Sequence, residues 1–216
     1  AFKMKEIAII GAGPAGIEAA HILAQNNYHV HIFEKCAEPL SNIVDKAFLF
    51  PNFADAHEIA EKLKQKLQHQ NIEVICNHNV DHIHSELTAD SRGENFPPYQ
   101  QAIVDNKQFD AAIIATGYTP FDAHKKEELG YGIYNGVITS LELESMIRSK
   151  SINSPTLTTP QRIVFLQCVG SRDEKIGNHY CSKLCCVTAV KQAIEVKKCI
   201  PNAEIYIFYM DVRMWG

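Results

Sequence analysis

The chain has 216 residues, of which 46% are hydrophobic and 21% charged, the balance of a packed globular protein. A formal charge of −4 and the lack of a basic stripe exclude a nucleic-acid-binding protein. The sequence has no apolar run of about 18 residues, so it predicts no membrane span. The start lacks a signal-peptide core, so we expect a cytoplasmic protein. The chain has seven Cys, and four of them lie between Cys168 and Cys186. In a cytoplasmic protein this clustering indicates metal or redox chemistry rather than structural disulfides.

The first segment predicts a dinucleotide-binding βαβ unit. An apolar strand over residues 7–10 leads into the sequence GAGPAG, which is followed by a helix over 17–25 and a strand over 30–33 that ends at Glu34. The candidate cofactor-binding residues here are Gly11, Gly13, Pro14, Ala15, Gly16, Glu34 and Lys35.

Each glycine of this motif has a physical role. Gly11 permits the tight turn, Gly13 allows the backbone to approach a pyrophosphate, and Gly16 allows the helix to pack close to the strand. The helix N-terminus offers N–H groups and positive dipole to the phosphates. Glu34 accepts hydrogen bonds from a ribose diol and would repel a 2′-phosphate, so we expect an unphosphorylated adenosine ribose.

The middle of the chain predicts further elements of the same domain. A helix is expected over residues 54–70, with strands over 72–76, 80–84 and 101–104 and a polar surface loop over 85–100. His78, His82 and His84 have no acid or Cys at ligand spacing, so the histidines are interpreted as exposed and solvated. Cys36, Cys76 and Cys199 are isolated in the sequence and are interpreted as inert thiols.

A strand over residues 109–115 ends in Thr116 and Gly117, which complete the candidate cofactor-binding set. This strand and its ATG turn resemble those that close the flavin domain in the thioredoxin reductase and glutathione reductase families. Together with the first motif, this resemblance favours FAD over NAD.

A second βαβ unit carries cysteines where related reductases carry phosphate-binding glycines. Strands are expected over residues 163–167 and 203–209, joined by a helix on which Cys181 and Cys185 share a face. The spacing C-x12-C-x3-C-C lacks the paired knuckles of zinc sites and differs from the usual ferredoxin run. From spacing alone, a cubane iron–sulfur cluster, a zinc site and inert thiols all remain open.

Several motifs together resemble the A-subunit family of heterodisulfide reductase. They are QCVGSRD over 167–173, YCSKLCC over 180–186, KQA over 191–193, DVR over 211–213, ATGY over 115–118, FD over 121–122, ELGYG over 128–132 and VITSLE over 137–142. The resemblance implies that Cys168, Cys181, Cys185 and Cys186 bind a [4Fe-4S] cluster near an FAD. It also implies flavin-proximal positions for Lys191 and Glu144, whose alternative is ordinary helix-surface charge.

The chain departs from that family at three places. Residues 36–42 lack the usual glycine pair, no ferredoxin-type C-x2-C-x2-C insertion precedes the ATG strand, and the sequence stops just after the second βαβ unit. We therefore interpret it as an amino-terminal portion or as one piece of a split subunit.

The expected fold is α/β, with a Rossmann-type FAD domain over 1–148, a linker over 149–161 and a partial second Rossmann-like domain over 162–216. The predicted function is electron transfer by an FAD- and [4Fe-4S]-containing oxidoreductase subunit, with iron–sulfur or disulfide-reducing subunits as partners or a homodimer as the assembly. The alternatives are an NAD(P)H-dependent thioredoxin-reductase-like enzyme and a non-catalytic assembly subunit.

Overall fold

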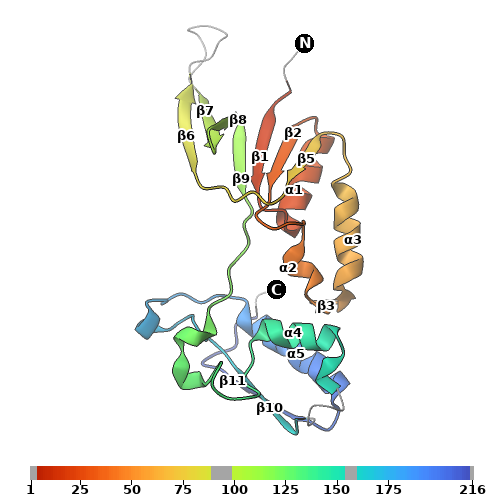
Figure 1. Cartoon of the computed structure of the whole chain (residues 1–216), viewed down its shortest axis with the longest axis vertical. Helices are drawn as coiled ribbons and strands as arrows, with labels where there is room; N and C mark the ends of the chain where they lie inside the picture. Colours follow the sequence, from red (N-terminus) through yellow and green to blue (C-terminus); the bar gives the residue numbers. More distant parts are fainter. Residues whose placement is uncertain (1–3, 89–98, 154–159, 215–216) are drawn as a thin grey trace. The chain divides into compact units, whose positions relative to one another are not determined.

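The computed structural model describes residues 4–88, 99–153 and 160–214, which form two compact units (Figure 1). The first unit contains residues 1–44 and 57–118, and the second contains 45–56 and 119–216. Throughout the described ranges, every helix is too short or too polar to cross a bilayer.

A parallel sheet forms the centre of the first unit, with strand order β5-β2-β1-β9. Its strands are β1 (Glu6–Ile10), β2 (His29–Phe33), β5 (Ile72–Ile75) and β9 (Ala111–Ile114), and its helices are α1 (Pro14–Gln25), α2 (Ser41–Val44) and α3 (Ala56–Lys66). Alternate residues of β1 pack into two separate cores, Ile7 and Ile9 into one and Ala8 and Ile10 into the other. Burial on both faces explains why the strand is continuously apolar.

A second, antiparallel sheet contributes to one of these cores. It contains β6 (Ile83–Thr88), β7 (Tyr99–Val104) and β8 (Lys107–Phe109), and its Val104 and Phe109 pack with Ala8, Ile10 and Phe33. The predicted loop over 85–100 is wrong at residues 85–88, which belong to β6, and at residues 99–100, which begin β7; residues 89–98 lie outside the described part of the chain.

The strand predicted over 109–115 is divided in the structure. Asp105 and Asn106 both have positive φ and form a tight turn between β7 and β8, so Phe109 ends β8. Asp110 separates β8 from β9, and its Oδ2 accepts a hydrogen bond from the backbone N–H of Glu6 at 2.7 Å.

The second unit contains the predicted βαβ arrangement. The parallel pair β10 (Arg162–Leu166) and β11 (Glu204–Phe208) is joined through α5 (Cys185–Cys199). It also contains β3 (Phe48–Leu49), β4 (Ala54–Asp55), α4 (Ser140–Arg148) and four short 3₁₀ helices: η1 (Ala123–Lys125), η2 (Glu127–Leu129), η3 (Ser151–Asn153) and η4 (Glu174–Ile176). Leu143 and Ile147 of α4 share a core with Val196 of α5.

The two compact units differ from the predicted domains of 1–148 and 162–216. The division falls after Tyr118 because α4 packs on α5 in the second unit. In the predicted linker, Ile152 is buried in the same core, and residues 154–159 lie outside the described ranges. The domain boundaries themselves stay a prediction.

Candidate cofactor-binding sites

The glycine turn after β1 has two glycines that the fold itself requires. Gly11 has φ of 107°, and a Cβ there would clash with the carbonyl oxygen of Ala115 at the end of β9. A Cβ at Gly16 would clash with the carbonyl oxygen of Gly11, so Gly16 allows α1 to pack closely on the turn. The structure therefore brings the GAGPAG turn and the ATG turn together.

Gly13 differs from both. Its φ of −77° suits any residue, and nothing lies within 4 Å of the position that a Cβ would occupy. It precedes Pro14 at the N-cap of α1, where no side chain caps the helix. The first turn of α1 thus presents backbone N–H groups beside an open position, the arrangement that suits a phosphate.

Glu34 is buried at the end of β2 and tied to the glycine turn. Its Oε2 accepts a hydrogen bond from the N–H of Ala12 at 2.7 Å, and its Oε1 accepts one from the N–H of Cys36 at 2.9 Å. Lys35 beside it is exposed, as are Thr116 and Gly117. The acid predicted for the ribose therefore lies against the predicted phosphate loop.

The segment that lacks the family's glycine pair still contacts this turn. Leu40 donates its N–H to the carbonyl of Ala12 at 3.1 Å and is buried. Its φ of 62° lies in the left-handed region that favours glycine, so a leucine here occupies a conformation that is costly for it. Cys36 and Cys76 are isolated in the sequence but follow the neighbouring strands β2 and β5. Burial, and to a smaller extent the negative charge of Glu34, raise the pKa of Cys76.

The cysteines of the second unit gather between the end of β10 and the start of α5. Cys168 has φ of 60° just after β10, Cys185 is the first residue of α5, and Cys186 is buried. Burial raises the pKa of Cys168. Burial acts to raise the pKa of Cys185 as well. Hydrogen bonds from the Cys168 backbone and from nearby side chains, including Ser182 and Cys186, outweigh burial and hold this pKa below its usual value.

Cys181 corrects one detail of the prediction. It precedes α5 and does not share a helix face with Cys185, because the helix begins only at Cys185. Its sulfur accepts a hydrogen bond from the N–H of Lys183 at 3.4 Å. Among the described residues, no three of the cysteine sulfurs all lie within 4.8 Å of one another.

Two arginines lie beside these thiols, and both pair with the same carboxylate. Arg213 donates its backbone N–H to the sulfur of Cys186 at 3.5 Å, and its guanidinium is paired with Asp211 at 3.0 Å. Asp211 also pairs with Arg172, a residue that follows Cys168 in the QCVGSRD motif. The QCVGSRD and DVR motifs therefore meet beside the cysteines, where two guanidinium groups favour thiolates.

Lys191 and Glu144 form a buried ion pair and are not surface charges. The Lys191 Nζ lies 2.7 Å from both carboxylate oxygens of Glu144 and 3.1 Å from Oε2 of Glu195. Gln192 donates its Nε2–H to Glu144 at 2.9 Å, and burial raises the pKa of Glu195. Glu195 and Gln192 were missed because their burial depends on α4 packing against α5.

The chain is similar to flavoprotein reductases over most of its length. Residues 5–162 match the pyridine nucleotide-disulphide oxidoreductase family. The A-subunit of the H(2)/formate:CoB-CoM heterodisulfide,ferredoxin reductase of Methanococcus maripaludis is 54% identical over 110 residues, which is 48% of this chain and 17% of that protein.

A second relative aligns along nearly the whole chain. The iron-sulfur A-subunit of the CoB--CoM heterodisulfide reductase of Methanocaldococcus jannaschii is 32% identical over 291 positions, covering 98% of this chain and 44% of the relative. The chain thus spans less than half of the length of these relatives. Among solved structures, L-proline dehydrogenase from P. horikoshii aligns over 99% of this chain and 37% of its own, with 16% identity and a TM-score of 0.44.

Proposed function

We propose that this chain binds FAD at the turn between β1 and α1. The chain belongs to the pyridine nucleotide-disulphide oxidoreductase family, whose model matches residues 5–162. The observation that carries the proposal is Gly13. The fold requires glycine at positions 11 and 16, but at Gly13 neither the φ angle nor the packing requires glycine. A ligand that must approach the backbone closely explains that glycine.

The neighbouring residues fit the two polar parts of such a ligand. The uncapped first turn of α1, with Pro14, Ala15 and Gly16, would bind the pyrophosphate. Glu34 would bind the ribose hydroxyls after releasing or sharing the N–H of Ala12. Thr116 and Gly117 lie at the end of β9 beside Gly11, in reach of the same loop.

We further propose that Cys168, Cys181, Cys185 and Cys186 bind a [4Fe-4S] cluster. Four thiols with two guanidinium groups nearby fit a thiolate-bound cluster of negative charge.

Together these sites support electron transfer as the function. When bound, FAD exchanges one or two electrons and an iron–sulfur cluster exchanges them singly, so the pair can connect a two-electron donor to a one-electron acceptor. The named relatives are subunits of heterodisulfide reductases, and we propose that this chain works with other subunits of such a complex, in the cytoplasm. The flavin-proximal role of Lys191 and Glu144 stays a prediction.

Anaerobic purification followed by absorbance, iron, sulfide and flavin analysis tests this function. We expect flavin bands with a broad cluster shoulder, and about four irons and four sulfides per chain. Flavin alone, with rapid bleaching by stoichiometric NADH or NADPH, would instead identify the thioredoxin-reductase-like enzyme. A folded, colourless protein after reconstitution with FAD, iron and sulfide would identify the assembly subunit.

A further inference from the structure

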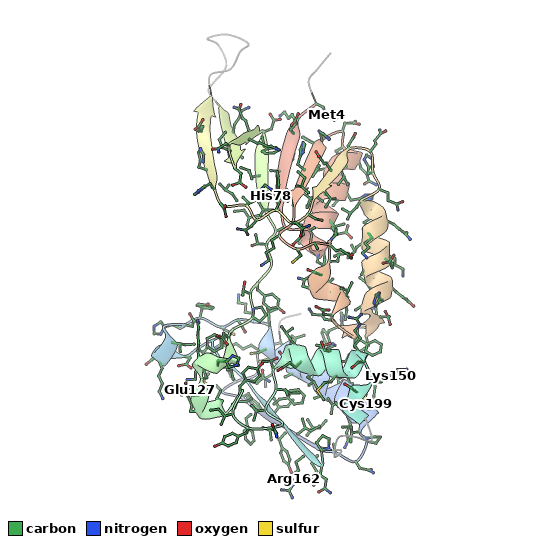
Figure 2. All side chains as sticks on the ribbon, in the orientation of Figure 1. Met4, His78, Glu127, Lys150, Arg162 and Cys199 are labelled. Carbon is green, nitrogen blue, oxygen red and sulfur yellow. The ribbon has the colours of Figure 1, made fainter. Side chains whose placement is uncertain are left out.

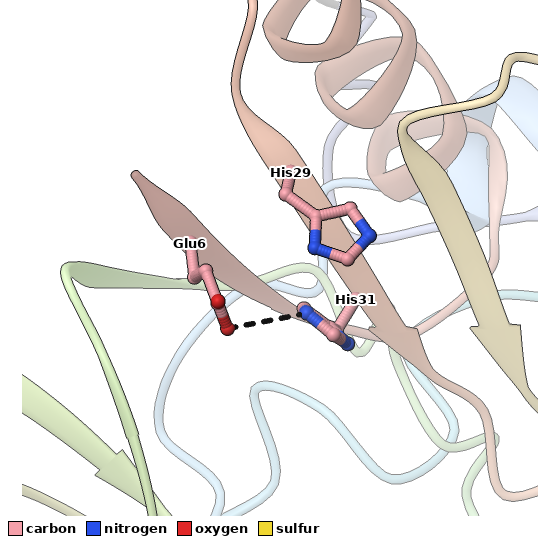
Figure 3. A group of neighbouring side chains, drawn as sticks. All are labelled: Glu6, His29 and His31. Carbon is pink, nitrogen blue, oxygen red and sulfur yellow. Dashed lines mark ion pairs between the residues drawn. The ribbon is translucent and has the colours of Figure 1, made fainter. Parts of the chain in front are cut away.

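A separate group of side chains lies at the other end of the first unit's parallel sheet. Glu6 and His29 are the first residues of β1 and β2 and are directly paired in the sheet register, and His31 lies two residues further along β2 (Figure 3). The glycine turn follows the carboxyl end of β1, so this group is distinct from the proposed FAD site.

The three side chains converge on one point. The His31 Nε2 lies 3.5 Å from Oε2 of Glu6, and the rings of His29 and His31 have centroids 4.6 Å apart. One ligand atom from each of the three residues lies within 4.8 Å of the other two. Figure 3 shows both imidazoles and the carboxylate on the same side of the two strands.

A fourth residue fixes the His31 ring. Glu73, paired with His31 in the register of β5 and β2, places its Oε2 2.9 Å from the His31 Nδ1. Because a carboxylate only accepts hydrogen bonds, Nδ1 carries the proton, and in the neutral ring the lone pair is on Nε2. A carboxylate that holds one nitrogen of a histidine while the other faces inward is the outer-shell arrangement of metal-binding histidines.

The inward-facing nitrogen, His31 Nε2, is buried. Among the described residues it makes no hydrogen bond, although Oε2 of Glu6 lies 3.5 Å away. A buried polar atom without a partner is costly, and native proteins normally satisfy it. Glu6 and Glu73, with Asp110 hydrogen-bonded to the Glu6 backbone, add negative charge around it. A cation between His31 and Glu6 would satisfy both the nitrogen and the carboxylates.

We propose that Glu6, His29 and His31 bind a divalent transition-metal ion, with Zn²⁺ as the matching ion. Two imidazoles and one carboxylate are a zinc ligand set, whereas Ca²⁺ and Mg²⁺ prefer oxygen ligands alone. Tetrahedral bonds of about 2.0–2.1 Å place ligand atoms about 3.3 Å apart. Glu6 is 41% exposed at its side chain, so a side-chain rotation can close the distance from 4.8 Å.

The position indicates a structural role. Ligands of open α/β sheets bind at the carboxyl ends of the strands, and this group is at the amino ends. A bound ion would join β1 and β2 directly and β5 through Glu73, so it would stabilise the folded first unit by mass action.

Zinc binding to the purified full chain tests the proposal, with each variant compared with wild type because any cysteine thiols without a cluster would also bind zinc. Equilibrium dialysis should show about one zinc fewer per chain in His31→Ala. Glu73→Gln should keep that zinc with an affinity about 10–100-fold weaker. His84→Ala is the matched control, because His84 also lies on a strand beside a carboxylate, with its Nε2 3.3 Å from Glu86.

Cobalt separates the two kinds of ligand. Co²⁺ at the cysteines gives sulfur-to-metal charge-transfer absorption, which should be the same in wild type and His31→Ala while total bound cobalt falls by about one equivalent. If His31→Ala does not fold, His29→Gln at the start of β2 provides the same comparison. Equal zinc stoichiometry and affinity in wild type and in a folded His31 or His29 variant would overturn the proposal.

Discussion

The two βαβ units share one geometry but differ in the turn that connects strand to helix. In the first, residues 11–13 connect β1 to α1, and in the second, residues 167–184 connect β10 to α5. Both helices begin without a side-chain cap, so both offer positive dipole to an anion. The short glycine turn leaves open backbone for a phosphate, whereas the long turn brings cysteines from both of its ends to the helix start.

The two helices differ as much as the turns do. The buried residues of α1 are the small or apolar Gly16, Ile17, Ala20 and Ala24. Those of α5 include Lys191, Gln192 and Glu195. A helix that only supports a cofactor loop can have an apolar buried face, but buried charges need partners, which α5 finds on α4. The buried face of α5 therefore depends on α4 for its charge partners, whereas that of α1 needs none.

The largest expected effect is the loss of the cluster from the cysteine turn. Replacing Cys186 with Ala removes one thiolate and leaves an iron open to solvent, so iron content should fall to near zero. Single Ala replacements at Cys168, Cys181 and Cys185 should do the same. Iron analysis and low-temperature electron paramagnetic resonance of dithionite-reduced protein measure the loss.

Cys199 is the matched control for this experiment, because it lies at the other end of α5 (Figure 2). Cys199→Ala should keep full iron and the full signal. If Cys186→Ala retains its iron while Cys199→Ala loses it, the ligand assignment is wrong. One metal per chain without sulfide in wild type would identify zinc.

The next largest effect concerns the glycine turn. Gly13→Val should remove FAD while leaving the unit folded, because nothing lies within 4 Å of the added Cβ, whereas the side chain would enter the proposed pyrophosphate path. Gly16→Val should lower stability by about 1–3 kcal/mol or more, because it forces α1 away from the turn. Flavin stoichiometry and urea unfolding separate the two results, and full FAD content in folded Gly13→Val contradicts the site.

A third effect tests the buried charges of α5. Lys191→Met should lower stability by about 3–5 kcal/mol, because it leaves Glu144 and Glu195 buried without their cation. Adding Glu144→Gln should recover part of that loss. Lys197→Met, at an exposed position on the same helix, should cost about 1 kcal/mol or less. Urea unfolding measures all three, and equal losses at Lys191 and Lys197 would contradict the buried pair.

The sequence predicted what depends on local spacing. The resemblance to the A-subunits of heterodisulfide reductases, the α/β fold and membership of an oxidoreductase family are confirmed. The run over residues 7–10 identified β1 because a strand buried on both faces must be continuously apolar. A capping box at Thr139 and Glu142 also marked the start of α4, a local signal that was overlooked.

The rest depends on residues far apart in the chain. Glu144 and Lys191 are brought together only by the packing of α4 on α5, so no spacing could show that they are buried. Glu6 and His29 meet through the register of β1 and β2, and Glu73 joins them from β5. Distance along the chain groups only His78, His82 and His84, so the group at the amino ends of β1 and β2 becomes visible only in the folded sheet.

The smallest expected effect is the pH dependence that Glu195 gives to the second unit. Burial raises the pKa of its carboxyl in the folded protein, with Lys191 and Lys198 opposing the shift and Glu144 adding to it. Between the ordinary and the raised pKa the folded state binds the extra proton, so stability falls as pH rises through this window. Glu195→Gln cannot titrate and should flatten the dependence, whereas Glu61→Gln at an exposed position should not. Urea unfolding from pH 5 to 8 measures this, and parallel curves for wild type and Glu195→Gln would show that Glu195 is ionised in the folded protein.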